Sequence, residues 1–175
     1  MCDACGGLRL RNLALLALQH GIRAEAATLL NIGDFDDIRL HVRQDQAESI
    51  GVVPLDHDGQ HKLAMCLAWR ESKGEVLEAG SPLLMSYSRR NAGQRIGYDT
   101  IDKLVTQLRQ ATGINFHAHQ FRHTFATNLV LDGMNPYHLM TLTRHKSVQS
   151  FRRYTQAAKQ QAAEAAFYDK RRQQT

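Results

Sequence analysis

Apolar residues recur at helical spacing along most of the chain, and one short region alternates them singly with polar residues. Residues 8–19 are apolar on most sides, which predicts a buried helix, and Gly21 ends or bends it before a second helix over residues 23–30. Residues 38–43 alternate as a half-buried strand does, and residues 49–55 are predicted to be the hairpin partner of that strand. The first third of the chain is therefore predicted to be a helix pair followed by a β-hairpin.

The rest of the chain predicts more helices and one long loop region. Helices are expected over residues 57–71, 98–110, 119–131, 136–142, 148–154 and 156–168, and a short third strand over residues 82–87. Residues 86–97 are a loop rich in arginine. The predicted fold class is α+β, mainly helical, with a small antiparallel β-sheet.

Length and charge favour one domain with a polyanionic partner. A chain of 175 residues has room for a single domain with a sizeable core. Lys and Arg number 22 against 17 Asp and Glu, which gives a formal net charge of +5 and a sequence pI of about 9.3. An excess of this size supports a nucleic-acid partner but does not demonstrate one, since many proteins are equally basic.

Cysteine usage and hydropathy indicate a soluble protein of the cytoplasm. The three cysteines, Cys2, Cys5 and Cys66, cannot all pair, and no signal-peptide pattern is present. The longest apolar stretch, residues 13–18, ends at Gln19, well short of the roughly 20 residues that a membrane helix needs. No membrane association is expected.

The pentapeptide HQFRH at residues 119–123 groups side chains that can bind phosphate and transfer protons more closely than any other segment of the sequence. Positions three and four apart share one side of a helix, so His119, Arg122 and His123 can converge on a single small group. A guanidinium can hold the oxygens of a phosphodiester bidentately, which suits Arg122. Tyr154 offers a hydroxyl that can attack phosphorus, although a phenol of pKa about 10 needs a base and a positive field. The pattern predicts a phosphate site.

Several motifs in sequence order resemble the catalytic domain of the tyrosine recombinase, or phage integrase, family. They are Gly21-Ile22-Arg23 before Asp34-Phe35, the hairpin end Val52-Val53-Pro54-Leu55, His119 through Thr127 (HQFRHTFAT), and Leu142 through Ser147 (LTRHKS) before Tyr154-Thr155. The resemblance covers nearly the whole chain, and the motif that begins at His119 is the most specific.

The resemblance implies site-specific DNA recombination, that is integration, excision or resolution, through a 3′-phosphotyrosine intermediate. Arg23 and Arg122 would bind the nonbridging phosphate oxygens, and His145 would donate a hydrogen bond to the phosphate. His119 would assist proton transfer with the nucleophile Tyr154, while His123 would support the site. The two transesterifications retain the bond energy, so neither a cofactor nor a metal ion is expected.

Two positions depart from the family pattern. Family members usually carry a lysine in the hairpin that protonates the leaving 5′ oxygen, whereas residues 43–46 here read RQDQ. Arg43 supplies charge but a guanidinium is a poor general acid, and Lys62 and Lys73 are less well placed. Arg144 stands where the family usually has glycine, and it would either add a phosphate contact or point away from DNA.

The implied partner is double-stranded DNA in the nucleoid. Arg89, Arg90 and Arg95 are candidates for contacts to the DNA backbone, with a solvated loop as the alternative. By resemblance, the protein associates with itself on DNA as a tetrameric synapse, and a monomer is the alternative for an isolated domain. Because a few phosphate contacts would dominate binding, affinity is expected to be weak and strongly salt-dependent.

Residues 1–175 are interpreted as one catalytic domain without the family's N-terminal DNA-clamp domain. Residues 1–7 are expected to be flexible, and residues 156–175 to form a terminal helix and tail that is displaced or exchanged between protomers.

Three competing hypotheses stay open. A type IB topoisomerase shares the fold and the tyrosine chemistry, and a catalytically impaired chain would bind DNA without forming an adduct. A zinc-dependent structural protein is the third, because Cys2-x-x-Cys5 and His57-x-x-x-His61 have spacings seen in zinc sites. The cysteines lie at a terminus and a histidine pair at helical spacing is usually exposed, so no metal site is predicted.

Overall fold

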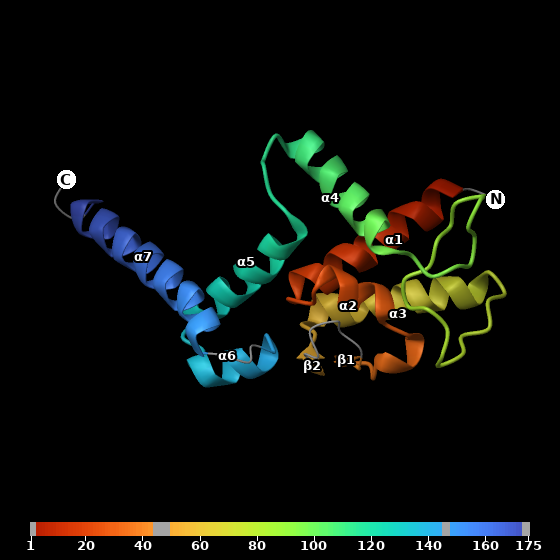
Figure 1. Cartoon of the computed structure of the whole chain (residues 1–175), viewed down its shortest axis with the longest axis horizontal. Helices are drawn as coiled ribbons and strands as arrows, with labels where there is room; N and C mark the ends of the chain where they lie inside the picture. Colours follow the sequence, from red (N-terminus) through yellow and green to blue (C-terminus); the bar gives the residue numbers. More distant parts are fainter. Residues whose placement is uncertain (1–2, 44–49, 145–147, 173–175) are drawn as a thin grey trace.

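The computed structural model, which describes residues 3–43, 50–144 and 148–172, consists of helices with a two-stranded sheet at one edge (Figure 1). In chain order the elements are α1 (Asp3–Gln19), α2 (Ala24–Leu29), the 3-10 helix η1 (Ile32–Asp34), β1 (Arg39–Val42), β2 (Gly51–Pro54), α3 (His57–Ser72), α4 (Tyr98–Thr112), α5 (Ala118–Leu131), α6 (Pro136–Leu142) and α7 (Val148–Arg172). The predicted fold class, mainly helical with a small antiparallel sheet, is confirmed.

The hairpin has the alternation that its sequence predicts. β1 pairs antiparallel with β2, with Leu40 opposite Val53 and Val42 opposite Gly51. Leu40, Val42 and Val53 are buried in the main core. Because successive side chains of a strand point to opposite faces, the intervening His41 lies on the other face of the hairpin.

The third strand expected over residues 82–87 is wrong. Within the described part of the chain this segment makes only isolated bridges. Pro82 has no N–H to donate to a ladder. The buried guanidinium of Arg70 donates through Nη1 to the carbonyl oxygens of Pro82 and Leu83, both at 3.0 Å, so a side chain takes acceptors that a neighbouring strand would need.

α1 ends in a sharp turn that sets up the first motif. The N–H of Gly21 donates to the Leu18 carbonyl at 3.0 Å and the N–H of Ile22 to the Ala17 carbonyl at 3.1 Å, which is the Schellman pattern. This pattern requires a left-handed residue, and Gly21 has a φ of +73°. The chain therefore reverses at once, and Arg23 lies at the N-terminal cap of α2.

Two hydrophobic clusters divide the core. The larger one joins α1, α2, the hairpin, α3 and α4, and the smaller one joins α5, α6 and α7 through Ala126, Leu139 and Phe151. The candidate site lies between them, because α5 packs against both α1 and α7.

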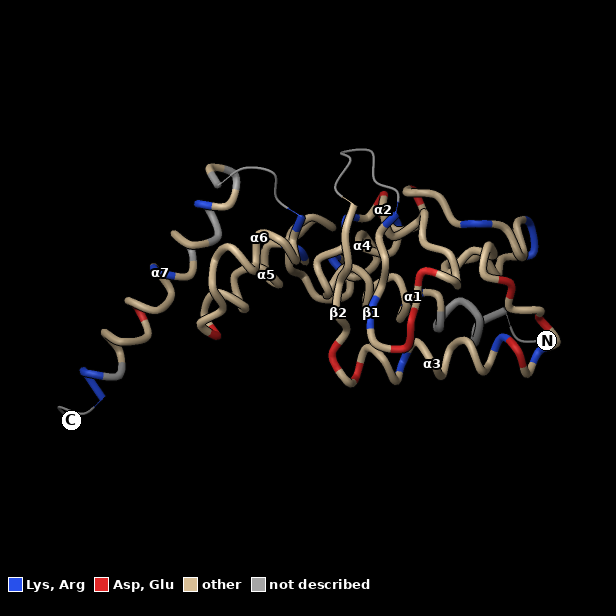
Figure 2. The backbone as a smooth tube through the Cα atoms, turned by 90° about the horizontal axis from the view of Figure 1, so that it is seen from below, with Lys and Arg blue, Asp and Glu red and all other residues tan. Residues whose placement is uncertain are grey.

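α7 is one continuous helix where two segments were predicted, since its Ala- and Gln-rich sequence contains neither Gly nor Pro. Phe151 and Ala158 are buried, whereas every residue from Lys159 to Tyr168 is exposed. Both views show this part of the helix running away from the rest of the chain, and Figure 2 shows Lys and Arg at several points along α7 (Figures 1 and 2). Among the described helices, none combines the length and apolar character needed to cross a membrane.

Candidate functional site

α5 carries the three candidate site residues of the HQFRH motif, His119, Arg122 and His123. The helix begins at Ala118, where the Gln120 side chain accepts a hydrogen bond from the His117 N–H at 2.6 Å. The rings of His119 and His123 lie edge to face with centroids 5.1 Å apart. Arg122 is only 1% exposed, and its Nη1 donates to the Gly21 carbonyl at 2.8 Å.

Two guanidinium groups converge on that carbonyl. Nη2 of Arg144, which follows α6, also donates to the Gly21 oxygen, at 3.3 Å. A carbonyl oxygen has two lone pairs, so it can accept from both groups, and its partial negative charge reduces their mutual repulsion. This oxygen therefore binds two arginines of the predicted site directly. The third, Arg23, follows Gly21 by two residues in the chain.

The surroundings of His119 lower the pKa of its imidazole. Although the residue is exposed overall, partial desolvation of the ring is the largest cause, and the positive charges of His123, Arg122 and Arg23 lower the pKa further, against a smaller opposing effect of Glu25. The structure thus brings Arg23 and Arg122 close to His119. A histidine kept neutral near pH 7 can accept a proton.

The remaining two catalytic candidates lie toward the C-terminus. His145 falls outside the described residues. Tyr154 lies in α7, one turn after Phe151, which is buried in the cluster shared with Ala126 of α5. The helix that carries the candidate nucleophile is therefore packed against the helix that carries His119 and Arg122.

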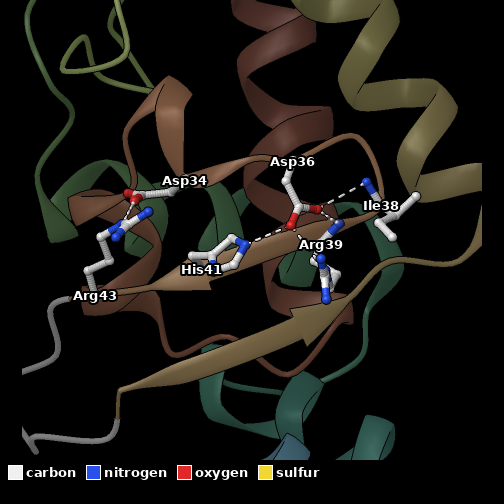
Figure 3. Close-up of polar contacts among 6 residues, drawn as sticks. All are labelled: Asp34, Asp36, Ile38, Arg39, His41 and Arg43. Atoms are coloured by element: carbon white, nitrogen blue, oxygen red, sulfur yellow. Dashed lines mark hydrogen bonds and ion pairs between the residues drawn. The ribbon is translucent and has the colours of Figure 1, made fainter.

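Arg43 directly follows β1 and is paired with an aspartate, as Figure 3 shows. Its Nε donates to Oδ1 of Asp34 at 2.6 Å, and the Asp34 side chain is only 6% exposed. Asp34 also accepts the Asn31 N–H at 2.9 Å. Nε2 of His41, in β1, lies 2.8 Å from Oδ2 of Asp36, which precedes the strand, and this contact lowers the pKa of the aspartate.

The three arginines of the basic loop divide into two kinds. Arg95 donates to the carbonyls of Thr28 and Leu30 at 2.8 and 2.9 Å and to the Asn31 side chain at 2.5 Å, so it satisfies carbonyls at the C-terminal end of α2. Arg89 and Arg90 are exposed. Arg95 is exposed as well, but its guanidinium is bound to these oxygens.

A cavity of about 940 Å³ lies on the side of α5 that faces away from His119 and Arg122. Its apolar walls come from α1, the end of β2, α5 and the segment before α5 and include Leu16, Leu55, Phe116, Phe121 and Phe125. Lys62 lines this cavity and pairs with Asp58 at 2.5 Å. This lysine therefore lies on the far side of α5 from the candidate site.

The zinc hypothesis lacks a ligand set in the part of the chain that the structure describes. No group of three or more His, Cys, Asp or Glu side chains there is arranged to hold a metal ion. Cys2 falls outside the described residues.

Sequence reasoning missed one functional group, the Gly21 carbonyl, because a backbone oxygen has no sequence letter. A usable signal exists, since a glycine that ends a buried helix two residues before Arg23 marks a left-handed turn. The burial of Asp34 against Arg43 also escaped the sequence analysis.

The geometry described above is accompanied by clear similarity to known proteins. The chain belongs to the phage integrase family, whose profile matches residues 1–161. It is 28% identical over 162 residues to the tyrosine recombinase XerC of Chromohalobacter salexigens and 26% identical over 160 residues to XerA of Pyrococcus horikoshii. These matches cover 90% of this chain and 52% and 54% of the relatives, so the chain spans about half the length of the curated relatives it matches.

Solved structures confirm the fold. A crystal structure of XerA recombinase matches with a TM-score of 0.69 and 21% identity, covering 95% of this chain and 62% of that one. XerH bound to a palindromic difH substrate, in a post-cleavage complex, matches with a TM-score of 0.71 and 22% identity, covering 95% and 46%.

Proposed function

We propose that this chain is a tyrosine recombinase that cleaves and rejoins DNA in site-specific recombination, through a covalent bond between Tyr154 and a 3′ phosphate. The observation that carries the proposal is the proximity of Arg122 and Arg23 to His119, on and beside a helix that packs against the helix that holds Tyr154. The similarity to XerC and XerA recombinases supports the same reaction class.

In the proposed reaction, the phenol oxygen of Tyr154 attacks phosphorus, the bond from phosphorus to the 5′ oxygen breaks, and a 3′-phosphotyrosine forms. His119 accepts the phenol proton, because its lowered pKa favours the unprotonated ring, which has a free nitrogen lone pair. Arg122 and Arg23 stabilise the negative charge that develops on the phosphate oxygens. A second DNA strand then attacks through its 5′ hydroxyl and releases the tyrosine. His145 is proposed to hydrogen-bond the phosphate, and His123 to support His119.

The leaving 5′ oxygen needs a proton, and the residues that could supply it are limited. Residues 44–49 between the strands contain no lysine. Arg43 is paired with Asp34, and a guanidinium with a pKa above about 12 gives up its proton poorly. We therefore assign Arg43 to hairpin stability, and slow cleavage of ordinary DNA is expected.

Double-stranded DNA is the proposed partner, and Arg89 and Arg90 are the proposed backbone contacts of the basic loop. Arg95 is left out of this set because its guanidinium caps α2. Phosphate contacts of this kind make affinity fall steeply with salt.

Self-association on DNA is the second proposed property. In the exposed part of α7, Phe167 is 54% and Tyr168 61% exposed. Two neighbouring exposed aromatic side chains suit packing against another copy of the chain. Sedimentation of the chain with and without duplex DNA tests this property. Replacing both aromatics with serine should abolish the larger species while leaving the DNA-free monomer intact.

The central test uses nicked duplexes with randomised sequence around the nick, because the cognate site is not needed in advance. Covalent adducts are captured on the protein under denaturing conditions and the attached strand is sequenced. Wild type should give adducts at a defined sequence, Tyr154→Phe should give none, and Tyr137→Phe, an exposed tyrosine on α6, should behave as wild type. An adduct that persists in Tyr154→Phe would refute the assignment of the nucleophile.

A second substrate separates a missing acid from a missing nucleophile. With sulfur in place of the bridging 5′ oxygen, the leaving group departs as a thiolate and needs no proton. Strong adduct formation on the sulfur-containing DNA but not on ordinary DNA would show that the chain lacks the general acid that protonates the leaving 5′ oxygen. Relaxation of supercoiled plasmid without sequence preference would instead favour topoisomerase-like activity.

A further inference from the structure

Arg144 has a backbone conformation that suits glycine. Its φ is +54°, in the left-handed region that a bulky side chain rarely adopts. The observed conformation thus agrees with the glycine that the family resemblance suggests for this position. An arginine held in this region needs compensating contacts from its side chain.

Those contacts fasten three parts of the chain together. The aliphatic part of Arg144 crosses Gly51 of β2 so closely that a Cβ on Gly51 would lie 3.1 Å from both Cγ and Cδ of the arginine. Nη1 donates to the carbonyl of Leu142 at 3.4 Å, and Nη2 donates to the carbonyl of Gly21 at 3.3 Å. With 6% exposure, the side chain of Arg144 is directed into the protein.

The contacts of Arg144 reach the proposed catalytic residues through the Gly21 carbonyl. The same oxygen accepts from Arg122 at 2.8 Å, and the turn that contains it leads into Arg23. Arg144 also immediately precedes His145 in sequence. The side chain therefore links the segment that leads to His145 with the anchor of both proposed phosphate-binding arginines.

We propose that Arg144 is a positioning residue for strand cleavage, which holds the Gly21 turn and the segment before His145 in fixed relation through the carbonyl that it shares with Arg122. The inference rests on the proposed function. It assigns Arg144 no contact with DNA, because the guanidinium faces backbone oxygens inside the protein.

The first measurement is single-turnover adduct formation at saturating DNA, with DNA affinity measured separately. Arg144→Gly removes the side chain and suits the backbone, and it should slow adduct formation about 10- to 100-fold, the effect of small misplacements of reacting groups. DNA affinity and its salt dependence should stay within about twofold, since no phosphate contact is lost. Arg144→Lys should restore most of the rate, because an ammonium can also donate to Gly21.

A second route to the same perturbation uses Gly51. Gly51→Val should push Arg144 off its position and slow adduct formation in the wild-type background. In the Arg144→Gly background the same substitution should have no further effect, because the side chain it displaces is gone. Additive effects of the two changes would contradict the proposal.

The inference can be tested even if the chain forms no adduct, in which case the proposed function fails by itself. Desolvation is the largest cause of the lowered pKa of His119, and the charges of His123, Arg122 and Arg23 add to it, so an NMR titration of His119 responds to the positions of these arginines. In Arg144→Gly these arginines lose their fixed place, so the pKa of His119 should rise toward its ordinary value, and Arg144→Lys should keep it low. Should Arg144→Gly fail to fold, as judged by circular dichroism, Gly51→Val provides the same reading.

Besides additive effects of the two changes, three results would overturn the proposal. One is a folded Arg144→Gly variant with an unchanged adduct rate or an unchanged His119 titration. Another is weaker DNA binding with a smaller salt dependence, which would make Arg144 a DNA contact. The third is a lysine variant no better than the glycine variant in both measurements.

Discussion

Gly21→Ala adds one methyl group at the turn on which the candidate site depends. Gly21 has a φ of +73°, and a Cβ built there would lie 2.6 Å from Cδ1 of Phe125. A left-handed conformation costs a non-glycine residue about 1–2 kcal/mol. Forcing an extra carbon into packed surroundings costs about 1–3 kcal/mol more. The expected loss of unfolding free energy is therefore about 2–5 kcal/mol, by adding these two ranges.

The assay is urea unfolding followed by circular dichroism, with Gly113→Ala as the matched control. Gly113 has a φ of +70°, but no atom lies within 4 Å of a Cβ there, so only the backbone cost of about 1–2 kcal/mol applies. For a chain of this size each kcal/mol lowers the melting temperature by roughly 2–4 °C, so thermal unfolding should order the variants in the same way.

The double variant with Phe125→Leu isolates the contact itself. If the methyl group collides with the ring, Gly21→Ala should cost less in the Phe125→Leu background than in the wild type. Equal losses for Gly21→Ala and Gly113→Ala, or strict additivity with Phe125→Leu, would refute the close packing of the turn against α5.

Further predictions concern other parts of the fold. Arg95→Met should lower the unfolding free energy by about 1–3 kcal/mol through lost charged hydrogen bonds to the end of α2, whereas exposed Arg90→Met should stay within about 0.5 kcal/mol in the same urea assay. Because the folded pKa of His119 is depressed, its contribution to stability is present above the ordinary value near 6.5 and is lost as the pH falls through the folded pKa. Melting temperatures of His119→Gln should lack this dependence, and the adduct rate of wild type should fall in the same acidic range. The pKa of Asp36 lies below 3.8, mainly through its hydrogen bond to His41. The contribution of Asp36 to folding stability is therefore present above pH 3.8 and is lost as the pH falls through the pKa of the folded state. His41→Gln should raise the pKa of Asp36 in an NMR titration.

Local patterns in the sequence predicted most elements correctly. The helices at 98–110 and 136–142 and the hairpin were found because apolar spacing and caps act between residues a few positions apart. The third strand was wrong because a distant arginine, Arg70, takes the carbonyls of that segment. The break predicted between residues 154 and 156 was wrong, because no Gly or Pro ends the helix there and α7 continues through both residues.

The sequence by itself determined which side chains of the HQFRH motif group together, since His119, Arg122 and His123 share one helix face whatever the surrounding fold. Only the tertiary structure decided what the arginines do. Arg122 reaches a carbonyl 101 positions away, and Arg144 reaches the same atom across 123 positions. Arginine side chains are long and flexible, so their partners depend on which distant backbone oxygens the packed helices bring within reach, and no spacing along the chain encodes that distance.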